Sequence, residues 1–425
     1  MKADKLRLTK DVLHALVILT TFALLGTQNS VHYPFALMSI IGLCLVVKNL
    51  PEMFDQDSRR LFYIFALVWS PMLLSLPDAV DLKSASQTTF SYLHFLFGAY
   101  YVYWACCRQK TYRIVGIGVA ALVLFALLDA SFQFIYAKDI FGFPYDGAVL
   151  KGLFYPKERL GLFLAVLFPL LLHVIYGNRY KTFFYIVAFP LIVFILLLCS
   201  KRSAWLMFGL SMLGFCYLIC VNNGATKKIF TMGFAAVAAF ILSIAAVIYT
   251  PTFQTKATLS SGVLSGDLQK IDAASNYRLS LWTTGSSMFV ANSINGIGAR
   301  GYRHVYVEYA DPNNFWLREG RRGQTHPHLQ ILEIAVETGL FGLIGFLCIY
   351  LFFVRELFQE ARFSMKAIWV LAFLVAWFPL NTHLAFYGSY WSSFVWLLIP
   401  MALATPDFES LQTEGNLGEY RLKAF

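Results

Sequence analysis

Residues 160–177 read LGLFLAVLFPLLLHVIYG, a stretch without any Asp, Glu, Lys or Arg. A helix needs about 20 mainly apolar residues to cross the hydrocarbon core of a bilayer, and this stretch approaches that length. The whole chain of 425 residues has the same character, because 58% of its residues are hydrophobic and only 14% are charged. Soluble domains carry roughly 25% charged residues. The composition therefore excludes a soluble enzyme, a disordered chain and a secreted disulfide scaffold, and it indicates a polytopic membrane protein.

Apolar runs of similar length recur along the chain and predict about twelve transmembrane helices. They lie near 12–29, 32–50, 61–77, 88–107, 113–130, 160–177, 182–199, 203–221, 229–250, 329–354, 367–384 and 386–404. We therefore expect an all-α polytopic membrane protein in which residues 1–425 form a single integral membrane domain. The basic start of the chain resembles a secretory signal, but no small-residue cleavage site follows it, so we expect an uncleaved first span.

The formal net charge is +10, from 34 basic and 24 acidic residues. In a soluble domain this excess would suggest nucleic acid, but here many basic residues lie in short loops, where positive charge marks the cytoplasmic side of a membrane. With the N-terminus in the cytoplasm, the short loops on that side are more basic than the short loops outside. We therefore expect both termini to be cytoplasmic and no nucleic-acid partner.

All seven cysteines fall within or at the edge of apolar runs, so their pattern implies no disulfide framework. Two close pairs, Cys106-Cys107 and Cys216/Cys220, could in principle bind a soft metal. Neither pair has a histidine or carboxylate beside it, and apolar packing is the simpler interpretation. We expect no metal and no cofactor.

Two segments on the predicted outer side are too long to be simple turns, and loops of this size usually carry function. They are a shorter loop at 131–159 and a large loop at 251–328, which precedes the tenth predicted helix. The large loop begins with a stretch rich in Ser, Thr and Gly. It becomes amphipathic from Leu268 to Val290, which predicts helical pieces lying against the membrane.

Lys201-Arg202-Ser203-Ala204-Trp205 lies between the seventh and eighth predicted helices with almost no loop. It places two positive charges at the outer mouth of a tight helical hairpin, against the usual bias of such residues toward the inside. Arginine is suited to bidentate capture of phosphate, so Arg202 is a candidate anion ligand. The alternative is a turn whose basic side chains extend to the membrane interface.

Two arginines of the large loop lie in distinctive local patterns. Arg278 begins an amphipathic stretch with Trp282 four residues later on the same helix face, although a solvated arginine is the simpler alternative. Asn295-Gly296-Ile297-Gly298-Ala299-Arg300-Gly301-Tyr302 is a glycine-punctuated turn, and such turns can direct backbone N–H groups at an anion. A dinucleotide-binding reading of these glycines is weak, because no parallel strand precedes them.

The strongest local signal is Arg321-Arg322-Gly323-Gln324-Thr325-His326-Pro327-His328-Leu329-Gln330, which places two histidines at the outer start of the tenth predicted helix. A neutral imidazole near pH 7 can take a proton from an attacking hydroxyl. A zinc pair is an alternative, but its third ligand would have to be His304.

Glu333 and Glu337 follow the histidines, four residues apart on one face of the predicted helix. Carboxylates in a membrane span are expensive and usually have a specific partner. They could orient other groups or bind a cation inside the bundle. For Glu337 a structural role at the junction of helix and loop is at least as plausible as a catalytic one.

Taken in order, these motifs resemble the O-antigen ligase / O-antigen polymerase superfamily of bacterial envelopes. The resemblance rests on Lys-Arg-Ser-Ala-Trp at 201–205, Arg278 with Trp282, Asn-Gly-Ile-Gly at 295–298, His-Pro-His-Leu-Gln at 326–330 and Glu-Thr-Gly-Leu-Phe-Gly at 337–342. It runs from about 160 to 345, and the predicted layout of spans and loops is similar over the whole chain. Many members have Asn after the second histidine; here Leu329 stands there, so any role of that Asn is absent or moved to Gln330.

The resemblance implies a metal-independent, inverting glycosyltransferase of the polytopic GT-C type, with its site at the periplasmic face of the bacterial inner membrane. It implies ligation of O-antigen polysaccharide from undecaprenyl diphosphate to lipid A–core, in lipopolysaccharide biosynthesis. Arg202 and Arg278 would hold the donor diphosphate. His328, or else His326, would be the base or the positioning group for the acceptor hydroxyl. The candidate supporting residues are Lys201, Arg300, Arg321, Arg322 and Glu337.

Two alternatives remain open. A polymerase of the same superfamily uses the same donor, but the basic large loop suits a phosphate-rich acceptor such as lipid A–core and favours the ligase. A secondary transporter is the alternative from a different class, but transporters often have two similar halves and the halves of this chain do not resemble each other. The expected partners are the undecaprenyl-linked glycan, lipid A–core and membrane lipids.

Overall fold

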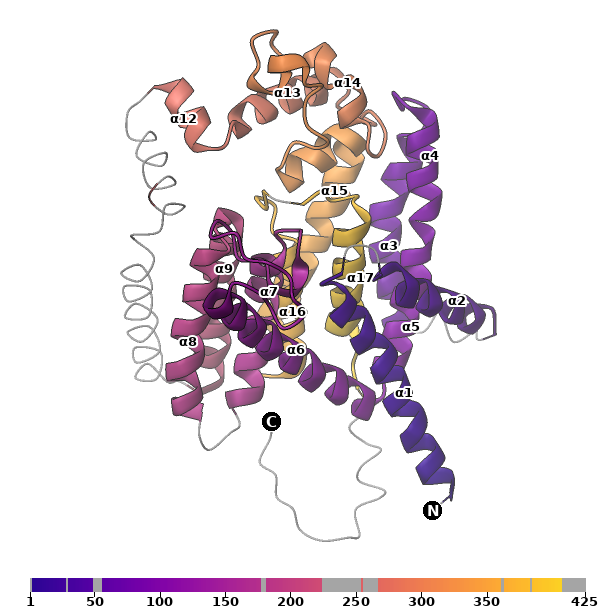
Figure 1. Ribbon diagram of the computed structural model, residues 1–425. Coiled ribbons are helices and arrows are strands. Elements are labelled where there is room, and N and C mark those ends of the chain that lie inside the picture. The colour runs from indigo at the N-terminus through magenta and orange to yellow at the C-terminus, as the bar shows by residue number, and fades with distance from the viewer. Residues whose placement is uncertain are drawn as a thin grey trace.

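The computed structural model describes residues 2–27, 30–48, 56–176, 181–223, 254, 267–360, 363–382 and 384–406. Figure 1 shows a bundle of helices with a smaller group of helices at one end. Within these residues no strand forms, and an isolated β-bridge joins Lys138 to Pro144.

The bundle is built from helices whose bounds follow the apolar runs of the sequence. These helices are α1 (Lys2–Leu24), α2 (His32–Lys48), α3 (Gln56–Leu74), α4 (Leu82–Ser91), α5 (Leu93–Cys106), α6 (Gln109–Tyr136), α7 (Leu160–Tyr176), α8 (Lys181–Leu198), α9 (Arg202–Asn223), α15 (Gln330–Gln359), α16 (Met365–Ala376) and α17 (Ser389–Leu403). The two long loops add η2 (Gly152–Phe154), α12 (Leu268–Ala274), α13 (Arg278–Ala291), α14 (Tyr302–Tyr309) and η4 (Phe315–Gly320).

A helix lies in eleven of the twelve predicted intervals, and the remaining interval, 229–250, lies outside the described residues. Within the part that the structure describes, α6, α9 and α15 are long and apolar enough to cross a membrane. Shorter apolar helices include α2, α7, α16, α17 and part of α8. The chain is therefore a helical membrane protein, and the all-α prediction is confirmed for these residues. The total of twelve spans and the GT-C topology stay predictions.

Three helices, α7, α16 and α17, form the centre of the bundle. Every residue is buried from Leu160 to His173, from Ala367 to Ala376 and from Tyr390 to Leu403. A helix that is apolar on all sides has no face suited to water, so it is covered by its neighbours. α7 packs against α6, α9 and α16, and α17 packs against α16 and α5.

The helices of the large loop form a layer at one end of the bundle, over the start of α15 and away from the start of α1 (Figure 1). α13 and α14 pack on α15 through a small apolar cluster that includes Leu281, Met288, Tyr302 and Val336. The amphipathic stretch predicted from sequence thus forms two helical pieces, α12 and α13. They place the polar residues of the loop directly above the membrane helices.

Two predicted spans differ from the helices observed. The run at 88–107 is divided at Tyr92 into α4 and α5, and α16 ends at Ala376 instead of continuing to about 384. Pro379 explains the early end of α16, since proline lacks a backbone N–H and disfavours helical geometry at the residue before it. Residues 377–388, called here the α16–α17 connection, are non-helical where the structure describes them.

Candidate functional site

The α16–α17 connection lies against the N-terminus of α15 and forms one side of the candidate site. The N–H groups of Gln330 and Ile331, in the first turn of α15, donate to the carbonyl oxygens of Asn381 and Pro379 at 2.9 and 3.1 Å. Buried backbone groups need partners, and the first N–H groups of a helix have none within the helix. The first turn of α15 and the α16–α17 connection therefore satisfy each other's backbone hydrogen-bonding groups. This pairing allows an irregular segment to lie inside the bundle.

Arg278 is the first residue of α13, and the preceding turn fixes its position. Residues 276–277 adopt left-handed φ angles of 60° and 56°. Ser275 Oγ accepts the N–H of Arg278 at 3.0 Å, and Asp272 Oδ1 accepts the N–H of the next residue at 2.9 Å. These contacts cap the start of the helix. Nη1 of Arg278 then donates to Oγ1 of Thr382 in the α16–α17 connection at 3.0 Å.

Arg202, the first residue of α9, lies within the electrostatic reach of Arg278. Its Nη1 donates to the carbonyl oxygen of Ala274, the last residue of α12. Burial and then the charge of Arg202 lower the pKa of Arg278 below its ordinary value. Two neighbouring cations repel each other unless an anion neutralises them. The structure thus brings together the two arginines that the sequence analysis assigned to one anion.

Arg300 approaches the far end of the α16–α17 connection from the glycine-punctuated turn. Its φ is left-handed at 66°, and its N–H donates to Oε2 of Glu337 at 2.6 Å. A Cβ added to Gly388 would lie 3.4 Å from Nη1 of Arg300, so the guanidinium covers this end of the connection. The N–H of Ile297 is taken by the carbonyl of Val336 at 3.0 Å. The N–H groups of Ile297 and Arg300 are thus occupied within the protein, and these contacts place Arg300.

Arg159 is a fourth arginine of this region, which the sequence analysis did not single out. It immediately precedes α7, and its Cζ lies 3.6 Å from the ring centroid of Tyr390 in the first turn of α17. Burial lowers the pKa of Arg159. Arg159 and Arg300 therefore approach the same end of α17. The sequence offered one signal: like Arg202, Arg159 stands directly before a long apolar run on the predicted outer side.

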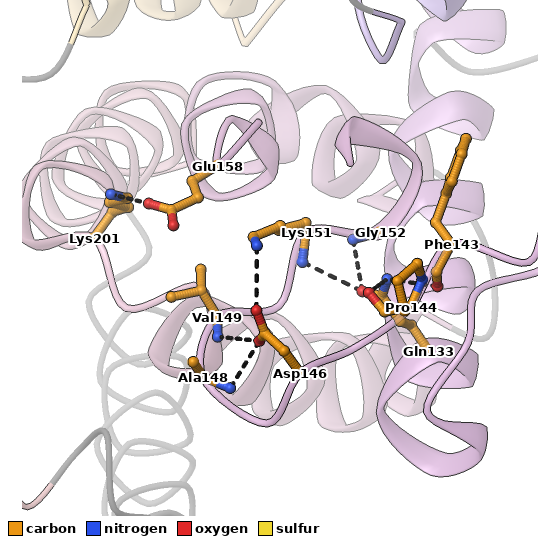
Figure 2. A network of polar contacts seen from close by, with 10 residues as sticks. All are labelled: Gln133, Phe143, Pro144, Asp146, Ala148, Val149, Lys151, Gly152, Glu158 and Lys201. Atoms are coloured by element: carbon orange, nitrogen blue, oxygen red, sulfur yellow. Dashed lines mark hydrogen bonds and ion pairs between the residues drawn. The ribbon is translucent and has the colours of Figure 1, made fainter. Parts of the chain in front are cut away.

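The shorter loop, which carries Arg159, is held in place by α6 (Figure 2). α6 continues to Tyr136, so the loop begins later than predicted. Oε1 of Gln133 accepts the N–H groups of residues 151–152 at 3.2 and 2.7 Å, and its Nε2 donates to the carbonyls of residues 143–144 at 3.2 and 3.4 Å. The buried side chain of Gln133 thus joins two segments of the loop, and these contacts hold in place the loop that carries Arg159.

Glu158 forms an ion pair with Lys201, as Figure 2 shows. The pair joins the shorter loop to the α8–α9 hairpin. Its two members are the immediate neighbours of Arg159 and Arg202 in sequence, so it also sets the spacing of these two arginines. Lys201, which the sequence analysis grouped with Arg202 as a supporting cation, is neutralised by this contact.

The guanidinium groups of the four arginines, Arg159, Arg202, Arg278 and Arg300, lack a carboxylate within ion-pair distance among the described residues. Lysines and arginines of the same loops that do form ion pairs include Lys151, Lys201 and Arg321. A partly buried charge without a counter-ion is costly and is typical of a ligand site. Arg202 and Arg278, which are electrostatic neighbours, and Arg159 and Arg300, which both approach the start of α17, are therefore suited to an anion such as a phosphate group.

His326 and His328 directly precede α15, as predicted. Their ring centroids lie 4.0 Å apart with the planes at 51°. Oγ1 of Thr325 lies 3.1 Å from Nδ1 of His326, and His328 has a left-handed φ of 51°. Two residues after His328, the N–H of Gln330 donates to the carbonyl oxygen of Asn381. The next residue, Thr382, accepts the hydrogen bond from Arg278. The histidines and the Arg278 contact thus lie at the same end of α15.

The remaining candidates lie at the edge of this arrangement. Nδ1 of His304 lies 3.6 Å from Oδ2 of Asp81, the N-cap residue of α4. In the part of the chain that the structure describes, no three His, Cys, Asp or Glu side chains lie close enough to hold a metal ion. Arg321 and Arg322 are exposed, and Arg321 pairs with Glu319 at 2.9 Å.

Comparison with known proteins agrees with the resemblance. Residues 187–347 match the family model described as O-antigen ligase. This segment belongs to the O-antigen ligase family. A protein of Rickettsia conorii named "Putative polysaccharide ligase" is 25% identical over 133 residues, which are 31% of this chain and 32% of the relative. A protein of Rickettsia felis with the same description is 25% identical over 133 residues, or 33% of its length. The alignments thus span about a third of these curated relatives.

The O-antigen ligase match contains most of the candidate site. Arg202, Arg278, Arg300 and both histidines lie inside residues 187–347. Arg159 and the α16–α17 connection lie outside this O-antigen ligase segment, on either side of it in sequence. Their part in the site is visible only from the folded chain.

Proposed function

We propose that this protein is a glycosyltransferase that ligates O-antigen polysaccharide from undecaprenyl diphosphate to lipid A–core. The observation that carries the proposal is two sets of partly buried arginines at the same end of the bundle as the two histidines that precede α15. Arg202 and Arg278 are electrostatic neighbours, Arg159 and Arg300 both approach the start of α17, and none of the four forms an ion pair among the described residues. A diphosphate is an anion that guanidinium groups bind with paired hydrogen bonds. The O-antigen ligase match supports the same class of reaction.

The proposed reaction is a displacement at the anomeric carbon of the donor sugar. The acceptor oxygen forms a bond to that carbon while the bond from the carbon to the diphosphate oxygen breaks, and the configuration inverts. The proton of the acceptor hydroxyl passes to His328, or to His326, and the electron pair leaves with undecaprenyl diphosphate. Negative charge on the leaving group grows in the transition state, so Arg202 and Arg278 stabilise that state more than the bound donor.

The location of the site suits a lipid-linked donor. The start of α15 and the helices α12 and α13 lie at the end of the bundle opposite the start of α1 (Figure 1). With the N-terminus in the cytoplasm, as the loop charges predict, this end faces the periplasm. The donor then reaches the arginines from the periplasmic leaflet of the inner membrane. Its polyprenyl chain stays in the lipid and its glycan lies in the periplasm.

The proposal is tested by expressing the protein in a bacterial host that lacks its own O-antigen ligase and examining lipopolysaccharide on a gel. A ladder of polymer on lipid A–core is the expected result. A bare core in this host, with restored chain length in a host that lacks its O-antigen polymerase, would reassign the acceptor to another undecaprenyl-linked repeat. Failure in both hosts, with the protein present in the membrane, would reject glycosyl transfer and favour the transporter.

Arg159→Ala is expected to lower kcat/KM of the ligase because it removes one cation of the anion site. A hydrogen bond to a charged group contributes about 1.5–3 kcal/mol, or roughly 10- to 100-fold in rate. Tyr390→Phe keeps the ring beneath the guanidinium and should behave as wild type, whereas Tyr390→Leu should lose part of the activity. Lys157→Ala, in the same loop and exposed, is the matched control. Equal activity of Arg159→Ala and Lys157→Ala would remove Arg159 from the site.

A further inference from the structure

The first two turns of α15 carry two buried carboxylates that the proposed chemistry does not use. Glu333 and Glu337 are 1% and 0% exposed. Each has one oxygen engaged by a backbone N–H and a second oxygen, Oε1, without a hydrogen-bond partner. Burying two neighbouring carboxylates is costly unless they hold specific partners. Their partners are therefore the clue to their role.

Glu337 holds the turn that carries Arg300. Its Oε2 accepts the N–H of Arg300 at 2.6 Å. Close to this contact α15 is kinked at Gly339, whose φ is 63°. The N–H of the next residue, Leu340, donates to the carbonyl oxygen of Ser293 at 2.8 Å. A Cβ on Gly296 would lie 2.5 Å from the Glu337 carbonyl carbon, so only glycine permits this approach. The turn is thus fastened to α15 on both sides of Glu337.

Glu333, one helical turn earlier, holds the other side of the site. Its Oε2 accepts the N–H of Phe386, in the α16–α17 connection, at 3.0 Å. Two residues beyond Phe386, Gly388 lies against the guanidinium of Arg300. Phe386 is itself buried against Trp377, with ring centroids 5.0 Å apart, which leaves the connection little freedom.

These contacts form a closed circuit around one arginine. Glu337 of α15 accepts the backbone N–H of Arg300, and the side chain of Arg300 covers Gly388 in the α16–α17 connection. The same connection is bound to α15 again, because Glu333 accepts the N–H of Phe386. The charges of Arg300 and Arg303 interact electrostatically with Glu337. Both carboxylates are too deeply buried to meet a substrate, so Glu337 acts on Arg300 directly and Glu333 acts through the connection that Arg300 covers.

We propose that Glu333 and Glu337 are positioning residues that fix the Arg300 guanidinium over the α16–α17 connection, where it binds a phosphate group of the substrate. This inference rests on the proposed function for its substrate, but the placement of Arg300 does not. Arg300 is then a further phosphate ligand, held by α15, whereas Arg202 is held by α12 and Arg278 by the α16–α17 connection. The geometry of the anion site thereby depends on the register between the large loop and α15.

A double-mutant cycle tests the proposal through activity. Glu337→Gln removes the negative charge and keeps the size of the side chain, and it is expected to lower kcat/KM by up to about 10²-fold, as misplacement of a binding group does. Most of the loss should be in KM if Arg300 binds the phosphate equally well before and during reaction. In an Arg300→Ala background the same substitution should cause no further loss. An equal loss in both backgrounds would overturn the proposal.

A distance measurement without substrate tests the placement itself. Spin labels at Glu308 on α14 and Ser389 on α17, both exposed, report the separation of the two segments in lipid nanodiscs. Glu337→Gln, Glu333→Gln and Glu337→Met should broaden the distance distribution, whereas Glu356→Gln should not. Glu356 lies near the other end of α15 and pairs with Lys366, so it is a matched control. An unchanged distribution in all three variants would reject the positioning role. A broadened distribution in a protein without ligase activity would keep it and reject the function.

Discussion

Arg278→Ala is expected to lower ligase turnover by about 10²–10³-fold, or about 3–4 kcal/mol, the usual effect of removing one preorganised donor from a developing negative charge. Arg278 is half-buried, capped by Asp272 and Ser275, and bound to Thr382, so it needs little rearrangement when the leaving group becomes charged. The loss should therefore fall mainly on kcat. Measured kcat and KM with a lipid-linked donor would separate this from a simple loss of binding.

Two further variants sharpen the Arg278 prediction. Arg278→Lys keeps the charge but removes the planar fork that matches a phosphate, so activity should lie between that of the alanine variant and the wild type. Arg318→Ala removes an exposed arginine from the same loop and should have little effect. If Arg278→Ala lost no more activity than Arg318→Ala, the diphosphate would have to be bound elsewhere.

His328→Ala is expected to lower turnover by about 10²–10⁴-fold, the range for loss of a general base. The donor diphosphate should still bind, because Arg202 and Arg278 are held by α12 and the α16–α17 connection and not by the histidine. Binding of a labelled polyprenyl diphosphate, measured beside turnover, would show the two effects separately. A transporter would bind and move its solute in the same variant.

Comparison of the two histidines identifies which one takes the proton. The rings of His326 and His328 lie 4.0 Å apart, so removal of the supporting ring should cost less than removal of the base. His304→Ala is the matched control, since this histidine lies in the same loop beside Asp81. A larger loss for His326→Ala than for His328→Ala would exchange their roles, and no loss for either would exclude a histidine base.

Much of the fold could be predicted from sequence because hydrocarbon imposes a simple rule on the backbone. A chain in lipid satisfies its N–H and C=O groups within a helix, so an apolar run of sufficient length is a helix. The run predicted at 203–221 is α9, Arg202–Asn223, and the run at 329–354 is α15, Gln330–Gln359. The charged ends of these runs also predicted that Arg202 and the histidines lie on one side of the membrane, and in the structure they lie at the same end of the bundle.

The same rule explains what hydropathy could not show. By hydropathy, the α16–α17 connection resembles the end of a span, but α16 ends at Ala376, shortly before Pro379. The carbonyl oxygens of Pro379 and Asn381 accept hydrogen bonds from the first turn of α15. Hydropathy measures local composition, so it does not predict a hydrogen bond between segments about 50 residues apart in the chain. The contacts of Thr382, Phe386 and Gly388 with the site were therefore unpredictable from local pattern.

The arginines illustrate the same limit. Arg202 and Arg278 were found through motifs, whereas Arg159 stands in no motif, and its place before an apolar run became informative only once the structure placed it over Tyr390. Lys201 looked like the equal of Arg202 in sequence, and the ion pair with Glu158 separates them. Which cation is neutralised depends on a partner more than 40 positions away, and that information exists only in the folded chain.

The bonds between the first turn of α15 and the α16–α17 connection also impose an order on biosynthesis. A membrane protein leaves the ribosome N-terminus first, so the large loop and α15 are made before Pro379, Asn381 and Thr382 emerge. Until then the N–H groups of Gln330 and Ile331 and the guanidinium of Arg278 lack their final partners. The anion site is therefore completed only when the C-terminal hairpin is inserted. Under the proposed function, a nascent chain that ends before the α16–α17 connection is therefore expected not to bind the lipid-linked donor.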